Sequence, residues 1–472
     1  MENTNAKWLL DAPAYDGGKY AEGLYNIGGG AKLTPESETG RLMVVSETNK
    51  DEFTAYLEKV ANEGYTKTFE NEVNGNLFAE FVKDGVMLYT YFTPHNAQAH
   101  IITDNECCPT SEFGYTYTPA KEDTSAFIQY GLIYDPTGKG GYKPPEKPFE
   151  NCGSFFIIRL ADNSVVLIDG GWDPQATLEI TEGVMQYLRE ITGVKAPEKV
   201  RVAAVFISHG HGDHVRMIKN LVNHYADQIV IERAMYNLPN SDEEVRGGGG
   251  AYFAEFGTEL MTAFPEAKFS KLHTGQKFNL ANVQFEVVFT HEDRVDPVTG
   301  HSLIVDYNAS STILKLTMSG GKTVMALGDW GGNWTCGIRE NEMAAYRGEE
   351  ATLFGMYGDE DGNSEFLKSD VVQIAHHAIN TWMGKVYTAI HADHAFFAQQ
   401  DVSYEEMAHG CYRDVVNQLR ATGMTDDRMY FGGRKTQLLT FTEDGEMLYS
   451  NYPLMCFNEL YLEMLKQHKP FN

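Results

Sequence analysis

Apolar and polar residues follow a helical period and then a strand period in the first part of the chain. The apolar positions of residues 51–65 recur at helical spacing, and Gly64 supplies a stop signal. The stretch LFAEFVKDGVMLYTYF, residues 77–92, predicts two strands joined at Asp84-Gly85, a dipeptide typical of short hairpins. A helix packed on a small antiparallel sheet is therefore expected in this region.

After residue 153 the pattern changes to apolar runs of strand length. SFFIIRLADNSVVLIDGG, residues 154–171, predicts two strands joined by a polar turn, and a helical stretch at about 176–191 leads to the buried strand VAAVFIS. Further strands are expected in QIVIERAMY, VQFEVVFTH, SSTILKLTMSGGKTVMALGD and SDVVQIAHH. RGGGGAYF, residues 246–253, predicts a flexible interruption and a candidate mobile loop over a site. The order of elements favours strands in layers with helices outside, an α/β or α+β sandwich.

A proline-rich stretch divides these two regions. YDPTGKGGYKPPEKPFENCGS, residues 134–154, contains four prolines and breaks any periodic pattern, as a linker or a long surface loop does. With 472 residues, the chain is too long for one ordinary core. We therefore expect an N-terminal accessory domain over 1–135, a linker over 136–152 and a third unit over 153–472. The accessory domain shows no cluster of titratable groups, which favours a supporting role or a homo-oligomer formed through it.

Composition narrows the class of partner. The chain carries 66 acidic and 38 basic residues, a formal net charge of −28, which disfavours nucleic acid and anionic membrane surfaces and favours a small-molecule substrate. A local basic groove remains compatible with this average. No apolar run approaches the roughly 20 residues that cross a bilayer, and the N-terminus lacks the pattern of a signal peptide. The six cysteines include no C-x-x-C pattern, so a cytoplasmic protein without a disulfide framework is expected.

The densest chemistry lies in VFISHGHGDHVRM, directly after an apolar strand. His209, His211, Asp213 and His214 fall within six residues, and the intervening glycines let the backbone bend so that these side chains converge. Imidazole and carboxylate together suit Zn²⁺, with Mn²⁺ or Fe as alternatives. One metal needs about three protein ligands, so four candidates favour two metals. His209 and His211 are expected to hold the first, and Asp213 and His214 the second.

Other predicted strands also end in residues that can bind metal. Asp329 follows VMALG and can link two ions, and His376 and His377 follow VVQIA. Asp169 ends VVLI, where its carboxylate can orient a ligand histidine from behind. An Asp before Gly at a strand end is by itself typical of a turn. The recurrence of such residues at successive strand ends, beside the histidine-rich turn, indicates one shared site.

This ordered set of motifs resembles the metallo-β-lactamase superfamily, and the resemblance covers roughly Gly153 to the C-terminus. It implies an α+β fold: an αββα sandwich with a dinuclear metal site along one edge, preceded here by the small α/β N-terminal domain. By the resemblance, Asp169 matches the first motif, Asp329 the bridging carboxylate, and His376 or His377 the last ligand. His209, His211, Asp213 and His214 match the second motif. The doubled histidine, with NASSTILKL upstream, looks most like the branch of competence-protein nuclease-like domains and phosphorylcholine esterases.

The sequence departs from the superfamily pattern at one ligand. A further histidine usually lies shortly before the Gly-Asp motif, and here the segment reads DYNASST, with Asn308. His291 and His301 are nearby candidates, and His291 is taken as the possible additional ligand. The branch named above also lacks that histidine.

The resemblance and the residue types together imply a hydrolase. Two cations about 3.5–4 Å apart share a water, lower its pKa and give a bridging hydroxide that attacks an ester or amide centre. Asp213 is expected to steer this nucleophile, and the spare member of the pair His376 and His377 to protonate the leaving group. A small phosphoester is the first choice of substrate, and a lactone or β-lactam the second.

Two other classes remain open. A di-iron redox protein is disfavoured because redox members of the superfamily carry Glu where this chain has His211 and require a flavin partner domain. A non-catalytic metal-binding relic is supported by Asn308 alone. Trp330, Trp334 and Trp382 follow the motifs and either wall a pocket that suits a choline-like cation or simply pack in the core.

Overall fold

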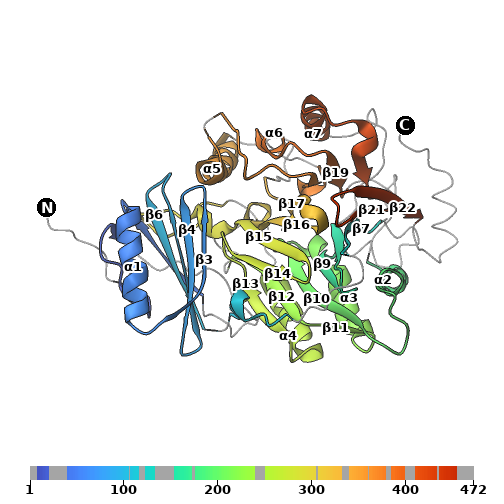
Figure 1. The fold of residues 1–472 in the computed structure, drawn as a ribbon, viewed down its shortest axis with the longest axis horizontal. Coiled ribbons are helices and arrows are strands. Elements are labelled where there is room, and N and C mark those ends of the chain that lie inside the picture. The colour runs from blue at the N-terminus through green and yellow to red at the C-terminus, as the bar shows by residue number, and fades with distance from the viewer. Residues whose placement is uncertain are drawn as a thin grey trace.

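The structure is a computed structural model, and it describes most of the chain. The described residues are 8–20, 40–105, 107–115, 123–132, 154–172, 176–239, 250–304, 307–331, 340–359, 361–378, 384–398, 410–432 and 435–453. Within them the strands form three sheets, one in the N-terminal part and two in the rest of the chain (Figure 1).

The N-terminal part is a helix packed on an antiparallel sheet, as the sequence predicts. Its strands lie in the order β1-β2-β6-β5-β4-β3. Their bounds are β1 Lys19–Tyr20, β2 Arg41–Ser46, β3 Thr66–Val73, β4 Asn76–Lys83, β5 Val86–Thr93 and β6 Gln98–Asp104. Helix α1 spans Lys50–Asn62, and the Asn49 side chain caps it by accepting from two backbone N–H groups. The predicted hairpin turn is confirmed, because Asp84 and Gly85 join β4 to β5 with φ values of 52° and 82°.

The two faces of this sheet have different partners because side chains alternate along a strand. Leu88 and Phe92 of β5 pack with Phe53 of α1 in a separate small core. Tyr89 and Tyr91 point to the opposite face and belong to the large core of the rest of the chain. The N-terminal sheet is thus attached to the main body through one of its faces, while α1 covers the other (Figure 1).

The main body consists of two packed sheets. The nine-stranded sheet runs β13-β12-β10-β9-β8-β7-β21-β22, with β11 also paired to β10. Its strands are β7 Ser125–Gln129, β8 Phe155–Arg159, β9 Val165–Asp169, β10 Val200–Ile207, β11 Ile229–Ile231, β12 Arg233–Tyr236, β13 Lys268–Lys271, β21 Lys435–Phe441 and β22 Met447–Pro453. The seven-stranded sheet runs in sequence order through β14 Lys277–Leu280, β15 Val283–Phe289, β16 Ile313–Thr317, β17 Thr323–Ala326, β18 Val371–Ile374, β19 His394–Phe397 and β20 Met429–Phe431.

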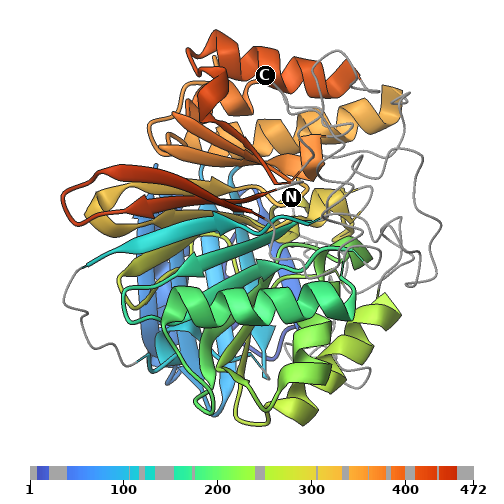
Figure 2. The ribbon, with the colours of Figure 1, turned by 90° about the vertical axis from the view of Figure 1, so that its right-hand side faces the viewer.

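Helices cover the outer faces of the two sheets. The core between the sheets includes Phe206 of β10, Phe285 of β15 and Phe396 of β19. Figure 2 shows one group of helices below the nine-stranded sheet and another above the seven-stranded sheet. The first group is α2 Leu178–Thr192, α3 Arg216–Tyr225 and α4 Gly250–Ala263, and the second is α5 Glu340–Tyr357, α6 Val386–Ile390 and α7 Gly410–Ala421. The expected αββα sandwich is confirmed. Among the described helices, none combines the length and the apolar character needed to cross a membrane.

Some details differ from the expected organisation, and one expected segment lies outside the described residues. Strand β7 precedes residue 135 and yet pairs with β8 and β21, because its register buries Phe127 between the sheets, so the expected boundary does not coincide with the edge of the main body. The expected linker, 136–152, lies outside the described residues. The expected strand QIVIERAMY is divided into β11 and β12. Of the expected loop 246–253, the first four residues lie outside the described part, and α4 begins at Gly250.

Candidate metal centre

Four strands end at the same edge of the sandwich. In the nine-stranded sheet β9 and β10 run parallel, and in the seven-stranded sheet β17 and β18 run parallel. The backbone N–H of Thr312, just before β16, donates to the carbonyl of Ser208, just after β10, at 2.9 Å, and so ties the sheets together at this edge. The residues that follow the carboxyl ends of these four strands are therefore brought together, as expected from their positions in the sequence.

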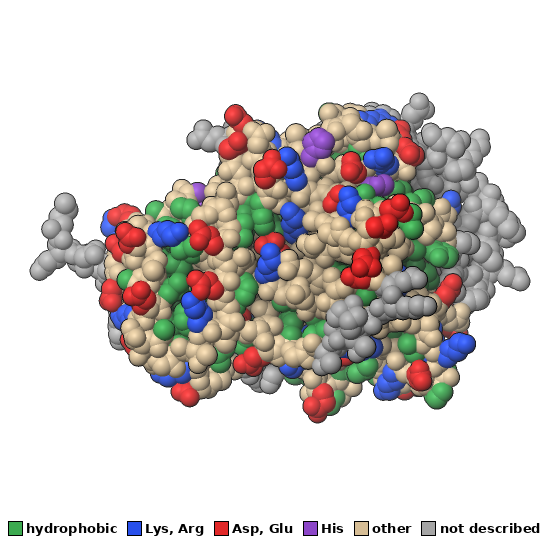
Figure 3. Space-filling view, in the orientation of Figure 1, with side chains coloured by type: hydrophobic (Ala, Val, Ile, Leu, Met, Phe, Trp, Pro, Cys, Tyr) green, Lys and Arg blue, Asp and Glu red, His purple; other side chains and the backbone are tan. Residues whose placement is uncertain are grey.

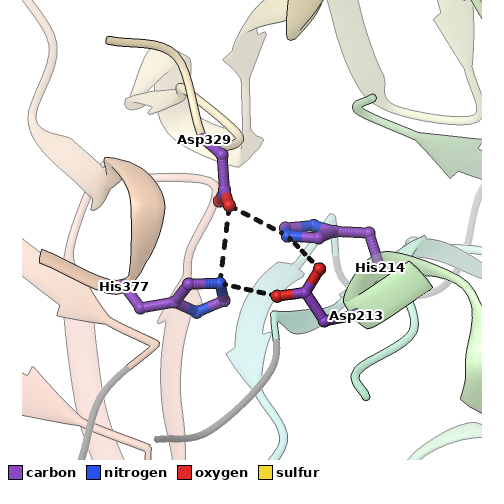
Figure 4. A group of neighbouring side chains, drawn as sticks. All are labelled: Asp213, His214, Asp329 and His377. Atoms are coloured by element: carbon purple, nitrogen blue, oxygen red, sulfur yellow. Dashed lines mark hydrogen bonds and ion pairs between the residues drawn. The ribbon is translucent and has the colours of Figure 1, made fainter. Parts of the chain in front are cut away.

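Four side chains form a compact group there (Figure 4). Asp213, His214, Asp329 and His377 each offer a ligand atom, and these atoms lie within 4.8 Å of one another. His214 Nε2 is 3.1 Å from Asp329 Oδ2 and 3.9 Å from Asp213 Oδ1. His377 Nε2 is 3.5 Å from both Asp213 Oδ2 and Asp329 Oδ2. Acidic and imidazole groups thus alternate around a common centre.

Hydrogen bonds at the far side of each ring fix which nitrogen faces this centre. His214 Nδ1 donates to Asp169 Oδ2 at 2.8 Å, and His377 Nδ1 donates to the carbonyl of Ala398 at 3.1 Å. A histidine that donates from Nδ1 keeps the Nε2 lone pair for a metal. The position of Asp169 behind a histidine is the arrangement expected from the sequence.

His209 is oriented in the same way by a residue that the sequence analysis did not single out. Ser208 Oγ donates to Asp169 Oδ2 at 2.8 Å and therefore accepts from His209 Nδ1, 3.1 Å away. His209 Nε2 is 3.8 Å from Asp329 Oδ2 and 3.0 Å from Nδ1 of His211. The available signal for Ser208 was a lone hydroxyl at the end of an apolar strand, directly before the histidines.

The pKa shifts of the buried histidines are those expected at a site that binds a cation. Burial, reinforced by His214, lowers the pKa of His209 well below its ordinary value, which keeps that imidazole neutral. Burial alone would lower the pKa of His377, but the carboxylates of Asp329 and Asp213 outweigh it and raise the pKa to about 10. The pKa of His214 is raised in the same way. The carboxylates around these two rings therefore favour positive charge at the centre, which a divalent cation can supply.

The residues present fit a divalent metal. Within the described part of the chain, Asp329 Oδ1 is buried and has no hydrogen-bond partner, an arrangement that is costly unless a ligand satisfies it. Nitrogen and oxygen donors of this type suit Zn²⁺ and also Mn²⁺ or Fe. Asp213, His214, Asp329 and His377 can hold one ion. His209 lies beside this group, 3.8 Å from Asp329 and 3.0 Å from His211, and the ligation of a second ion by His209 and His211 stays a prediction.

Close packing shapes the histidine-rich turn. A Cβ at Gly210 would lie 2.4 Å from a ring carbon of Tyr307, so only glycine fits between the turn and that ring. The ring of His211 lies beside Tyr307, with 5.9 Å between ring centroids. Tyr307 comes from a distant loop and had no signal in the sequence.

The doubled histidine adopts a strained backbone. His376, His377 and Ala378 have φ values of 47°, 53° and 60°, the left-handed region that disfavours residues with a side chain. This turn directs His377 into the four-residue group. His376 is buried outside that group, and its backbone N–H donates to the carbonyl of Gly328 at 3.2 Å.

The other candidates lie elsewhere. His291 Nε2 donates to Asn237 Oδ1 at 2.9 Å, and His291 does not belong to the four-residue group, so its ligation stays a prediction. Asn308 is buried at the start of a short 3-10 helix, and His301 lies on the surface. Trp330 is buried against Phe289, with ring centroids 5.8 Å apart. Trp334 and Trp382 lie outside the described residues.

The sequence and structure of this chain were compared with those of known proteins to identify its family. Residues 151–314 match the sequence model of the Metallo-beta-lactamase superfamily. No curated protein that was compared matches the chain. A metallo-beta-lactamase from Cronobacter sakazakii with a HARLDQ motif is similar at 20% identity, over 43% of this chain and 69% of that one, with a TM-score of 0.25. CmlA, a diiron beta-hydroxylase from Streptomyces venezuelae, is similar at 13% identity, over 65% of this chain and 55% of that one, with a TM-score of 0.33. At these TM-scores neither likeness carries an argument about activity.

The matched region contains Asp169 and the histidine-rich turn, while Asp329 and His377 follow it in the chain and join it only in space. The resemblance drawn from the sequence motifs is thereby confirmed for this region: residues 151–314 form a domain that matches the metallo-beta-lactamase superfamily.

Proposed function

We propose that this protein is a metal-dependent hydrolase with two divalent ions, most simply zinc, that acts on a small phosphoester. The observation that carries the proposal is the convergence of Asp213, His214, Asp329 and His377, from three segments of the chain, on one centre. When bound, a pair of divalent ions supplies a water of lowered pKa and neutralises the negative charge that develops on the attacked group.

The residues of the chain have distinct tasks in this proposal. His214, Asp329 and His377 are almost fully buried, whereas the Asp213 side chain is 16% exposed. Asp213 thus lies on the open side of the group, where it can accept a proton from the nucleophile and steer it toward a substrate. His376 lies beside His377, with 6.0 Å between ring centroids, and is proposed as the proton donor to the leaving group.

Charge supports a small substrate over a nucleic acid. The chain has a net charge of −28, and in the face seen in Figure 3 the basic side chains are interspersed with acidic ones without a continuous basic track. A lactone or β-lactam is the alternative substrate. A cytoplasmic location, and a homo-oligomer formed through the N-terminal domain, remain parts of this proposal.

The test combines metal analysis with turnover. The purified full chain is assayed with bis(p-nitrophenyl) phosphate, p-nitrophenyl phosphorylcholine, a lactone and a β-lactam, before chelation, after chelation and after zinc is returned. We expect about two zinc ions per chain and phosphoester hydrolysis that chelation abolishes and zinc restores. Hydrolysis that survives chelation contradicts the metal mechanism. Bound iron with visible absorption indicates a redox protein, and bound zinc without turnover of any substrate indicates a non-catalytic role.

A further inference from the structure

A buried glutamine lies between the two turns that carry Asp329 and His377. Gln373 is the third residue of β18, and it is 3% exposed. Its Oε1 accepts from the backbone N–H groups of Leu327 at 2.7 Å and Gly328 at 2.8 Å. An uncharged polar side chain inside such an apolar strand is unusual unless its hydrogen bonds are satisfied.

The amide nitrogen of the same side chain bonds to the turn before Asp329 and to the last residue of β18, which leads into the turn of His377. Gln373 Nε2 donates to the carbonyl of Gly328 at 3.1 Å and to the carbonyl of Ile374 at 2.7 Å. Two N–H donors face the oxygen and two carbonyls face the nitrogen, so only one orientation of the amide satisfies all four bonds. Gly328 directly precedes Asp329, and Ile374 lies three residues before His377.

Both turns have left-handed backbone conformations, and the one at His376 and His377 needs support because these residues are not glycine. Gly328 has a φ of 58°, and a Cβ there would lie 2.8 Å from the Ser208 Cβ. His376 and His377 are left-handed without being glycine, and such residues persist only where surrounding contacts hold them. The Gln373 side chain links the turn at Gly328 to the last residue of β18, from which the left-handed turn of His376 and His377 begins.

We propose that Gln373 is a positioning residue, which sets the distance between Asp329 and His377 and thereby the metal affinity of the four-residue group. The inference rests on the proposed metal function. Gln373 is neither a metal ligand nor a group that touches substrate, because all four of its hydrogen bonds go to backbone atoms.

The test is a zinc titration of two isosteric variants in the full chain. Gln373→Met keeps the side-chain length and removes all four bonds. Gln437→Met is the matched control, because Gln437 is also buried in a strand and bonds to the carbonyl of Phe431 and the hydroxyl of Tyr449, which belong to neither turn. Zinc affinity is measured by competition with a chromophoric chelator, and the geometry of the centre by the visible spectrum of the Co²⁺-substituted protein.

We expect Gln373→Met to bind zinc ~10- to 100-fold more weakly than the control and to show an altered Co²⁺ spectrum, by analogy with other groups that support metal ligands. Unchanged zinc affinity and an unchanged spectrum in folded Gln373→Met overturn the inference and leave the proposed function intact. Absence of zinc binding by the unaltered protein overturns the proposed function itself. Should Gln373→Met not fold, Gln373→Glu, which keeps the two accepted bonds, is compared with the control by the same criterion.

Discussion

His214 Nδ1 donates a 2.8 Å hydrogen bond to Asp169 Oδ2 across 45 residues of sequence. The same carboxylate oxygen accepts from Ser208 Oγ, and the other oxygen accepts from the Ser208 backbone N–H at 2.8 Å. One carboxylate at the end of β9 thereby orients His214 directly and His209 through Ser208.

The first prediction concerns this carboxylate. Asp169→Asn retains an acceptor for Ser208 but places an amide beside His214, which disturbs the ring orientation. We expect zinc affinity to fall by ~10- to 100-fold, measured by chelator competition. Asp370→Asn is the control, because Asp370 also bonds at a strand end, to the N–H of Thr323, away from the centre. Equal affinity in both variants would show that Asp169 has no orienting role.

The second prediction concerns the partly exposed ligand. Asp213→Ala removes one of the four converging groups, so the variant is expected to fold, bind less zinc and lose turnover by more than the ~10- to 100-fold typical of an outer hydrogen bond to a ligand. Zinc per chain is measured by elemental analysis, with the circular dichroism spectrum as a check on folding. The exposed Asp227→Ala serves as the control. Full activity with reduced zinc in Asp213→Ala would refute the mechanism.

The third prediction uses the two glycines of the histidine-rich turn. Gly210→Ala forces a Cβ against the ring of Tyr307 and is expected to destabilise the metal-free protein by about 1–3 kcal/mol. Gly212→Ala meets open space and should change stability by less than about 0.5 kcal/mol. Urea unfolding of both variants gives the free energies. Equal stability of the two variants would contradict the close packing of Gly210 on Tyr307.

The fourth prediction concerns the strained turn. Ala378 has a φ of 60°, so Ala378→Gly removes a left-handed penalty at the cost of some chain entropy, and a gain of about 0.5–1 kcal/mol is expected. Ala375→Gly in the same turn lacks a positive φ and is expected to lose about that amount. Thermal unfolding of the two metal-free variants is compared. A loss of stability in both would show that the strain at Ala378 is negligible.

The fifth prediction concerns pH. Burial raises the pKa of Asp293 from 3.8 to about 7, against the opposing effect of hydrogen bonds from Thr274, Thr290 and Tyr91, and the charge of Glu292 adds to the rise. Between pH 3.8 and about pH 7, the folded chain holds a proton on Asp293 that the unfolded chain has released. The contribution of Asp293 to the free energy of unfolding therefore falls as the pH rises from about 4 to about 7, by on the order of 4 kcal/mol.

Asp293→Asn mimics the protonated acid and should remove this pH dependence. Urea unfolding of the metal-free unaltered protein and of the variant, at both ends of the window, isolates the contribution of Asp293 because other groups are common to both. An identical pH slope in the two proteins would show that Asp293 is ionised throughout.

Much of the fold follows from local pattern. The hairpin at Asp84-Gly85 is specified by a dipeptide that tolerates positive φ, and helix α2 by its periodicity and by Gly193 in the left-handed conformation at its end. Strand β7 was not predicted as part of the main body, because its partners lie beyond the proline-rich stretch: β8 follows about 30 residues later and β21 about 300 residues later.

For the candidate site too, some features followed from the sequence and others only from the tertiary structure. The sequence by itself determined that His209, His211, Asp213 and His214 are neighbours, since six residues and two glycines allow little else, and strand ends marked Asp169 and Asp329. Only the tertiary structure decided that His377 and not His376 joins the group, because the left-handed turn that aims the ring is tied to the segment after β17 by the hydrogen bond that the His376 N–H donates to the carbonyl of Gly328.

The supporting residues were likewise beyond the sequence. Ser208 and Gln373 act through hydrogen bonds to groups far along the chain, and Tyr307 acts by occupying the space beside Gly210. Local sequence specifies which atoms can bind a metal. The distances between those atoms depend on packing between two sheets, which no single segment encodes.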